Sequence, residues 1–223
     1  MSGDVDLASV GAAIGEPARA LMLNALLGGQ ALPASELAQV ARVAPSTASA
    51  HLAKLTEAGL VTVESQGRHR YHRLAGADVA HALEVLATIA PPLQVKTLRA
   101  ANRAGAERHA RSCYDHLAGE VGVAVTDRFI ELGALEPESL ALLDARPLEA
   151  IGIHAAQLTG RRPMTRACLD WTERRPHVAG QVGAAILTAL LDLRWLKRAT
   201  AGRAVQLTQS GRKGLHSSLG LRT

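Results

Sequence analysis

Apolar residues recur at helical spacing in four short stretches of the first ninety positions, and helix-starting or helix-ending residues separate these stretches. The spacing predicts helices over residues 5–14, 17–27, 36–42 and 78–89. Pro17 suits the first turn of the second helix, Gly28 and Gly29 end it, and Ser35 is expected to cap the third. The first part of the chain is therefore predicted to be mainly helical.

A further helix is predicted over residues 45–58, with one apolar and one polar side. Pro45 and the hydroxyl residues after it are typical of a helix N-terminus, and Gly59 can end the helix in a left-handed conformation. The apolar stripe consists of Ala48, Leu52 and Leu55. The polar residues that we expect to face outward are Ser46, Thr47, Ser49, His51 and Lys54.

Two stretches of alternating polar and apolar residues follow this helix directly. Residues 60–63 and 68–74 flank the turn at Gln66 and Gly67, which predicts a β-hairpin. Arg68 and Arg70 lie near its tip. A polar-faced helix followed by such a hairpin can read duplex DNA, because the helix enters the major groove and the arginines reach phosphates or the minor groove.

Residues 45–61, followed by residues 67–74, resemble the recognition helix and wing of ArsR-type winged-helix repressors. The resemblance covers roughly the first ninety residues, since helix, cap glycine, wing glycine and arginines occur in order. It implies a dimeric, cytoplasmic repressor that a ligand releases from operator DNA, with the first and last helices of the domain pairing across the dimer. Ala50 stands where the family often has arginine, so one DNA contact of the family is absent.

The positions at which metal-sensing members of that family bind metal do not form a site here. The third helix carries Ser35, Glu36 and Gln39 but no cysteine, and the last helix offers only Asp78 and His81. Two candidate ligands make a poor metal site, so these residues are interpreted as surface residues. We expect any signal to enter elsewhere in the chain.

Length, composition and charge distribution limit the class of protein. The 223 residues, 48% of them apolar, are enough for two modest domains, and no apolar run is long enough to span a bilayer. The first residues lack the basic start of a secretion signal, so a cytoplasmic protein without membrane contact is expected. Up to Ala90 there are six Lys or Arg against eight Asp or Glu, and beyond it nineteen against twelve. The basic excess thus lies outside the predicted DNA reader, whose arginines act as a local patch.

Pro91 and Pro92 mark a boundary between two predicted domains, because successive prolines cannot continue a helix. Residues 1–92 form the ArsR-like DNA-binding and dimerisation domain of this interpretation, and residues 93–223 form an effector-sensing domain. The second domain is expected to begin with a long basic helix over residues 95–117. The exposed arginines of this helix would be Arg99, Arg103, Arg108 and Arg111.

An internal repeat organises the second domain. Residues 116–135 match residues 177–196 with eight identities over twenty positions and no gap, and the similarity extends over about 113–153 and 168–221. A hairpin turning near Gly202 and a last helix after Thr208 are predicted in the second copy. The fold class is therefore mainly α with small β-hairpin wings (α+β): a winged helix-turn-helix, then two degenerate winged-helix-like repeats. Glycines at matching positions, Gly119 and Gly122 with Gly180 and Gly183, predict helices that cross closely.

Cysteine, aspartate and histidine recur at corresponding places in the two copies. The six residues are Cys113, Asp115, His116, Cys168, Asp170 and His177. If the repeats approach one another, these side chains can bind a thiophilic metal ion such as zinc or line a pocket for a small-molecule effector. Structural roles, as buried cysteines and helix-end hydrogen-bond partners, and a redox pair are the alternatives.

These features together indicate a sequence-specific transcriptional regulator without enzymatic activity. We interpret it as a homodimeric repressor of a palindromic site on double-stranded DNA, responding to a ligand or metal in its second domain. One alternative is a thiol-dependent enzyme that uses the winged helix only as a dimer scaffold, with Cys113 or Cys168 as nucleophile. The other is a structural DNA binder without an effector.

Overall fold

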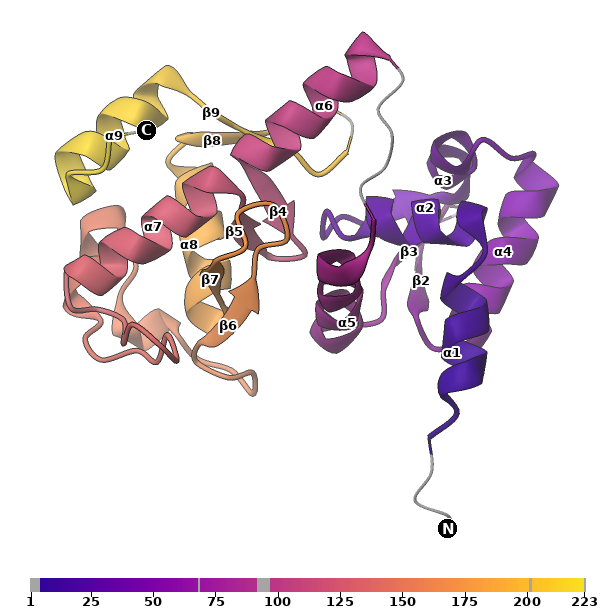
Figure 1. Cartoon of the computed structure of the whole chain (residues 1–223), viewed down its shortest axis with the longest axis horizontal. Helices are drawn as coiled ribbons and strands as arrows, with labels where there is room; N and C mark the ends of the chain where they lie inside the picture. The colour runs from indigo at the N-terminus through magenta and orange to yellow at the C-terminus, as the bar shows by residue number, and fades with distance from the viewer. Residues whose placement is uncertain (1–4, 68, 92–96, 201, 223) are drawn as a thin grey trace. The chain divides into compact units, whose positions relative to one another are not determined.

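The computed structural model describes residues 5–67, 69–91, 97–200 and 202–222 (Figure 1). The chain divides into two compact units, residues 1–83 and residues 84–223. About half of the chain is helical, and its strands are short and antiparallel, so the predicted α+β class is confirmed. Among the described residues, no helix is both long and apolar enough to cross a bilayer.

The first unit is a winged helix-turn-helix. Its helices are α1 (Leu7–Ile14), α2 (Pro17–Leu26), α3 (Ala34–Ala41) and α4 (Pro45–Glu57), and α5 (Ala77–Ile89) begins in it. Its strands are β1 (Leu32–Pro33), β2 (Val61–Gln66) and β3 (His69–Leu74), which form one antiparallel sheet in the order β1-β3-β2. The hairpin β2–β3 follows α4 directly, as the sequence predicts, and Gly67 at its turn has φ +60°.

The apolar stripe of α4 fixes this helix in the core of the first unit. Ala48, Leu52 and Leu55 are all buried, which confirms the predicted stripe. Helices α2 and α4 begin at Pro17 and Pro45 as predicted, but the start of α3 is not made as predicted. The N-cap of α3 is Pro33 without a side-chain cap, so the expected Ser35 cap is wrong. The α3 helix begins one residue before Ser35, and the proline at the N-cap already fixes an extended backbone there.

The second unit is built from short hairpins and the helices that follow them. Its helices are α6 (Leu98–His109), α7 (Glu120–Glu131), α8 (Gly180–Asp192) and α9 (Gln209–Leu219), with 3-10 helices η1 (Arg146–Ile151) and η2 (Ala155–Gln157). Its strands are β4 (Arg111–Cys113), β5 (His116–Ala118), β6 (Arg166–Leu169), β7 (Pro176–Ala179), β8 (Leu196–Arg198) and β9 (Val205–Leu207). They pair as three hairpins, β4–β5, β6–β7 and β8–β9.

The long helix predicted over residues 95–117 is wrong. The α6 helix ends at His109, Ala110 is extended with φ −156°, and the chain continues as strand β4. Arg111, expected to be exposed on that helix, is completely buried. The backbone N–H and C=O groups after Ala110 find hydrogen-bond partners in a sheet. Strand β4 pairs with β5 on one side, and Ser112 N donates to Arg203 O on the other.

The predicted repeat takes the form of a hairpin followed at once by a helix. Hairpin β4–β5 leads into α7, and hairpin β6–β7 leads into α8. Each helix packs against the hairpin of the other half, α8 against β5 and α7 against β7. The Thr126 hydroxyl on α7 even accepts a hydrogen bond from Val178 N on β7 (3.0 Å). Both halves therefore contribute to one continuous apolar core.

The two copies differ after their central helix. The second copy has the predicted hairpin β8–β9, and Thr208 caps the predicted last helix α9. The first copy has only an isolated bridge between Leu135 and Leu142, followed by η1. Both copies nonetheless end with a glycine in the left-handed conformation, Gly152 after η1 and Gly220 after α9. The first copy is thus the more degenerate.

The repeated glycines allow each helix to start tightly against its own hairpin. A Cβ on Gly122 would lie 2.6 Å from Leu117 O, and one on Gly183 would lie 2.3 Å from Val178 O. Gly119 and Gly180, at the two helix starts, have φ values of +82° and +80°. The predicted close crossing of the two helices through these glycines is therefore wrong. The nearest neighbours of Gly122 and Gly183 are strand carbonyls, and those of Gly119 and Gly180 are the carbonyls of Arg108 in α6 and of Pro163.

Candidate nucleic-acid interface and candidate metal centre

The outward side of α4 is short, polar and accessible. The exposed residues on it include Ser46, Thr47, Ser49 and Lys54, all of which the sequence singled out. The Ser49 hydroxyl donates to Pro45 O within the same helix (3.0 Å), which leaves its lone pairs available as acceptors. Because the opposite stripe of α4 is buried, the helix presents this side alone to a partner.

His51 is placed differently from the other residues of this set. Its side chain is only 16% exposed, with Nδ1 3.3 Å from Arg19 Nη1 and Nε2 3.6 Å from a Glu16 carboxylate oxygen. Both ring nitrogens therefore have partners on α2 or at its start. The imidazole is part of the packing between α2 and α4 rather than of the accessible surface.

The wing offers one exposed arginine among its described residues. Arg70 lies on β3 opposite Ser65, one pair away from the end of the ladder, and is exposed. Arg73 forms a cross-strand ion pair with Glu64 (2.8 Å). Arg68, the other predicted wing contact, lies outside the described residues.

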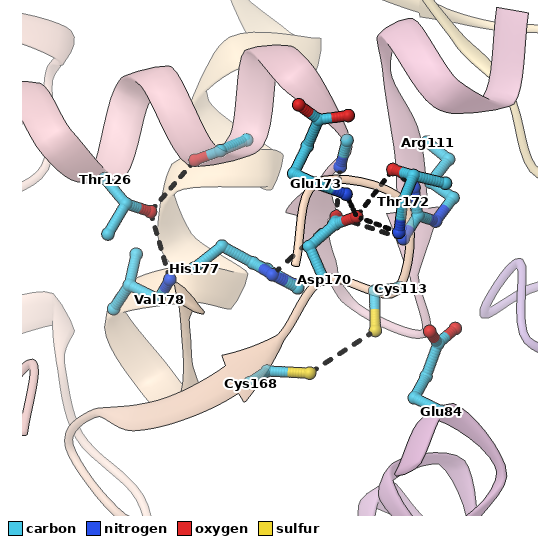
Figure 2. Close-up of polar contacts among 12 residues, drawn as sticks. Glu84, Arg111, Cys113, Thr126, Cys168, Asp170, Thr172, Glu173, His177 and Val178 are labelled. Carbon is cyan, nitrogen blue, oxygen red and sulfur yellow. Dashed lines mark hydrogen bonds and ion pairs between the residues drawn. The ribbon is translucent and has the colours of Figure 1, made fainter. Parts of the chain in front are cut away.

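In the second unit, four of the six repeated residues come together as a buried cluster. Figure 2 shows three of them, Cys113, Cys168 and His177. We call this cluster the Cys/His tetrad, and it consists of Cys113, His116, Cys168 and His177. One donor atom from each residue lies within 4.8 Å of all the others. In the strand register, Cys113 is directly opposite His116, and Cys168 is directly opposite His177. Each hairpin thus supplies one thiol and one imidazole from a single cross-strand pair.

The two sulfur atoms and the two rings face one another across the repeat. Cys113 Sγ and Cys168 Sγ are 3.9 Å apart, and the imidazoles of His116 and His177 stack with centroids 5.0 Å apart. The contact with Cys113, supported by both neighbouring imidazoles, holds the pKa of the Cys168 thiol far below its usual range. The same contact and burial raise the pKa of the Cys113 thiol. The cluster therefore favours a thiolate at Cys168.

The histidines of the tetrad carry polar atoms without hydrogen-bond partners in the described part of the chain. These atoms are His116 Nε2 and both ring nitrogens of His177. Both side chains are at least nine-tenths buried, so water does not replace the missing partners at their surface. Buried imidazole nitrogens normally have hydrogen-bond partners, so three without a partner beside two sulfur atoms require an explanation.

The two aspartates of the predicted set lie behind the histidines and outside the tetrad. Asp115 contacts His116 Nδ1 (3.4 Å) and forms an ion pair with Arg162. Asp170 Oδ2 is 3.9 Å from His177 Nδ1, 3.0 Å from Arg111 Nη2, and accepts a hydrogen bond from Gly119 N. Burial by itself would raise the pKa of Asp170, but Arg111 and hydrogen bonds from Thr172 and the backbone hold it well below its usual value. Both carboxylates are therefore positioned to orient imidazoles.

Buried arginines are the feature of this site that the sequence did not reveal. Arg111 is completely buried, lies 4.8 Å from the Trp171 ring and pairs with Asp170. Arg203 is buried in an ion pair with Glu84, and its carbonyl accepts a hydrogen bond from Ser112 N beside Cys113. Arginines in a basic stretch are usually exposed to solvent. Only the recognition that residues 111–113 form a strand would have predicted the burial of Arg111.

Comparison with known proteins identifies the family of this chain. Residues 14–64 match the family model described as "Helix-turn-helix domain". The uncharacterized HTH-type transcriptional regulator YdfF of Bacillus subtilis (strain 168) is 40% identical over 222 residues, covering 97% of this chain and 98% of that protein. The chain belongs to the HTH-type transcriptional regulators. The predicted class of DNA-binding transcriptional regulator is therefore confirmed, and the enzyme alternative is set aside.

Two solved structures are similar to part of this chain. The homodimeric winged helix-turn-helix DNA-binding domain of Mb0332 from Mycobacterium bovis is 30% identical, covering 40% of this chain and 89% of its own, with a TM-score of 0.35. The cadmium metal-sensor CMTR from Mycobacterium tuberculosis is 33% identical, covering 41% and 94%, with a TM-score of 0.34. At these TM-scores the family assignment rests on the full-length relative.

Proposed function

We propose that the chain is a homodimeric transcriptional repressor that binds a palindromic operator through α4. The observation that carries the proposal is the accessible polar side of α4, opposed by a buried apolar stripe and followed at once by a wing with an exposed arginine. Two such helices, one from each protomer, would enter successive major grooves about one helical turn apart. Occupation of the operator would then block transcription.

The residues of this surface have different roles in the proposal. Ser46, Thr47 and Ser49 are short enough to let the helix backbone approach base edges, which their hydroxyls can contact. Lys54 and Arg70 neutralise phosphates, and Arg68 is assigned the same role on the wing. His51 acts indirectly, because its contacts with Glu16 and Arg19 fix α4 against α2.

Exposed apolar side chains on the first and last helices of the winged domain support a homodimer. On α1, Leu7 is 74% exposed and Val10 is also exposed. On α5, Val85 and Leu86 are exposed and Ile89 is 78% exposed. These are the two helices that pair across the dimer in the family that the sequence resembles, and contact with a second copy would remove their apolar surface from water.

The second unit is proposed to bind the signal to which the repressor responds. The signal belongs to one of two chemical classes, a thiophilic metal ion such as zinc or a small-molecule effector. Binding would favour one arrangement of the two α4 helices over another, so that the state fitting DNA gains or loses population. Only a differential affinity for the two states can produce this response.

Operator binding can be tested with the full-length protein and a pool of random-sequence duplexes. We expect the selected duplexes to share an inverted repeat with half-sites about 10 base pairs apart. In the Lys54→Ala/Arg70→Ala variant, affinity for the selected duplex should fall. The slope of log K against log salt should become shallower by about 3.6, because the dimer loses four phosphate contacts, two per protomer, and each contributes about 0.9.

The Arg146→Ala variant is the control for this measurement. Arg146 is exposed in the second unit, where it pairs with Asp144, and it plays no part in the proposed surface. An unchanged slope in the double variant, or an equal loss in the control, would contradict the proposed contacts. A selected motif without dyad symmetry would contradict the homodimer. A reporter promoter that overlaps the selected site should be more active in cells lacking the protein, and no such increase would rule out repression.

A further inference from the structure

The Cys/His tetrad is one site formed by two equivalent local units, one from each half of the second unit. In each half, a short antiparallel hairpin places a cysteine and a histidine at paired positions, and the following helix starts at a glycine with positive φ. The equivalent ligands thus project from equivalent backbone positions. This arrangement brings two thiols and two imidazoles to one point from segments 55 residues apart.

The distances within the tetrad fit a tetrahedral metal ion. Zinc binds cysteine sulfur at about 2.3 Å and histidine nitrogen at about 2.0–2.1 Å, which places the donor atoms of a tetrahedron about 3.3–3.8 Å apart. The sulfur atoms are 3.9 Å apart, and the other donor distances are at most 4.8 Å. A small contraction of the cluster would therefore complete the coordination.

The unsatisfied nitrogens supply an independent argument for a ligand at this point. His116 contacts Asp115 through Nδ1, which leaves the buried Nε2 free to coordinate, and this atom has no partner in the described structure. His177 is completely buried, and its Nδ1 is directed towards Asp170. A metal ion would satisfy the remaining nitrogens, whereas a dry cluster would leave them unpaired at a cost.

The two aspartates provide the outer support that metal-binding histidines commonly have. A carboxylate behind the imidazole fixes the ring orientation and makes the coordinating nitrogen a better donor. Asp115 stands at this position in the first half, 3.4 Å from His116 Nδ1, and Asp170 lies 3.9 Å from His177 Nδ1, just beyond hydrogen-bond distance. Each carboxylate is held in turn by an arginine, Arg162 or Arg111. The carboxylate behind each histidine and the arginine that pairs with it thus repeat together with the ligands.

We infer that Cys113, His116, Cys168 and His177 bind one Zn²⁺ per chain in a closed tetrahedral site that joins the two halves of the second unit. Two sulfur and two nitrogen donors in this geometry select zinc over hard cations, and the complete set of four protein ligands leaves no open position for catalysis. The inference rests on the proposed function in one respect, because it places zinc in the unit that is proposed to bind the signal. The choice of the four ligands does not depend on that proposal, since it follows from their geometry alone.

Metal content and spectroscopy of the full-length protein test this inference. Protein purified under reducing conditions without chelators should contain one zinc per chain by elemental analysis. After chelation, titration with Co²⁺ should saturate at one equivalent, with the visible absorption of a tetrahedral cobalt site and a thiolate charge-transfer band. Because this titration uses the unmodified chain, it does not depend on whether a variant folds. Zinc should also raise the thermal midpoint of the chelated protein.

Matched variants locate the site. His177→Gln should lose stoichiometric zinc, whereas the same change at the exposed His154 should retain it. Asp115→Asn should keep zinc but bind it about 10–100-fold more weakly, because only the outer support is lost. Asp144→Asn, a change to an exposed ion pair, should leave the affinity unchanged.

The possible results separate this inference from the proposed repressor. Folded, reduced protein that contains no zinc and gives no tetrahedral cobalt spectrum would overturn the inference. Equal zinc retention in His177→Gln and His154→Gln would place the metal elsewhere and overturn it as well. Failure to select any duplex by a zinc-loaded sample would contradict only the DNA-binding proposal, because the metal readout does not involve DNA.

Discussion

Replacing Arg111 with methionine is expected to lower the free energy of unfolding of the second unit by about 3–5 kcal/mol. The methionine keeps most of the side-chain volume but leaves Asp170 completely buried without its cation. Hydrogen bonds from Gly119 N and Thr172 would still reach the carboxylate, but they do not carry a compensating charge. The unit also loses the contact between the guanidinium and Trp171.

Tryptophan fluorescence during urea unfolding measures this effect selectively. Both tryptophans of the chain, Trp171 and Trp195, lie in the second unit, so the signal reports that unit alone. Arg175→Met is the matched control, because its exposed ion pair with Asp127 should contribute little. The Arg111→Met/Asp170→Asn variant should be less unstable than the two single changes added together. Equal effects in Arg111→Met and Arg175→Met would show that the buried pair is not needed.

Gly119→Ala is expected to destabilise the same unit by about 2–6 kcal/mol, from backbone strain and overpacking together. The residue has φ +82°, and an added Cβ would lie 2.4 Å from Arg108 O. Its amide also donates to Asp170, so any movement of the backbone there disturbs the support of His177. Zinc affinity should therefore fall together with stability.

Gly133 is the control that separates the cost of backbone strain from the cost of a steric clash at the added Cβ. Gly133 has φ +73°, but a Cβ on it would have no neighbour within 4 Å. Gly133→Ala should show only the conformational part of the effect, at the lower end of the range for a strained residue of about 1–3 kcal/mol. Urea unfolding followed by fluorescence compares the two variants directly. If Gly119→Ala and Gly133→Ala unfold at the same urea concentration, close packing at Gly119 has no energetic role.

The winged domain was predictable because its signals are local. The spacing of Leu52 and Leu55, the cap at Gly59 and the turn at Gly67 each depend on a few neighbouring residues, and the structure has the helix and hairpin where they predict them. The Ser35 cap failed because Pro33 already fixes the extended residue before α3. The side chains proposed to contact DNA remain predictions, although Ser46, Thr47, Ser49, Lys54 and Arg70 are accessible.

In the second unit, the repeat predicted which residues are equivalent but not which of them contact one another in the folded unit. Strand β4 was mistaken for helix because residues 98–109 do form one, and nothing local marks its end at His109. The burial of Arg111 depends on Asp170, 59 positions away, which a local pattern cannot show. The cross-strand pairs could have been suspected from the two-residue spacer between Cys113 and His116, which fits a tight hairpin.

Each half of the second unit depends on the other for its core, because their helices pack on each other's hairpins. Because α7 covers β7 and α8 covers β5, neither hairpin–helix segment would have a complete core if the chain were cut between Gln157 and Arg166. The fragments should be unstable apart and should reassociate when mixed. A single copy of the segment would meet the same requirement by pairing with an identical copy. The hairpin–helix part of the unit is therefore equivalent to a dimer of two related segments fused into one polypeptide, with the regions after α7 and α8 departing from the symmetry.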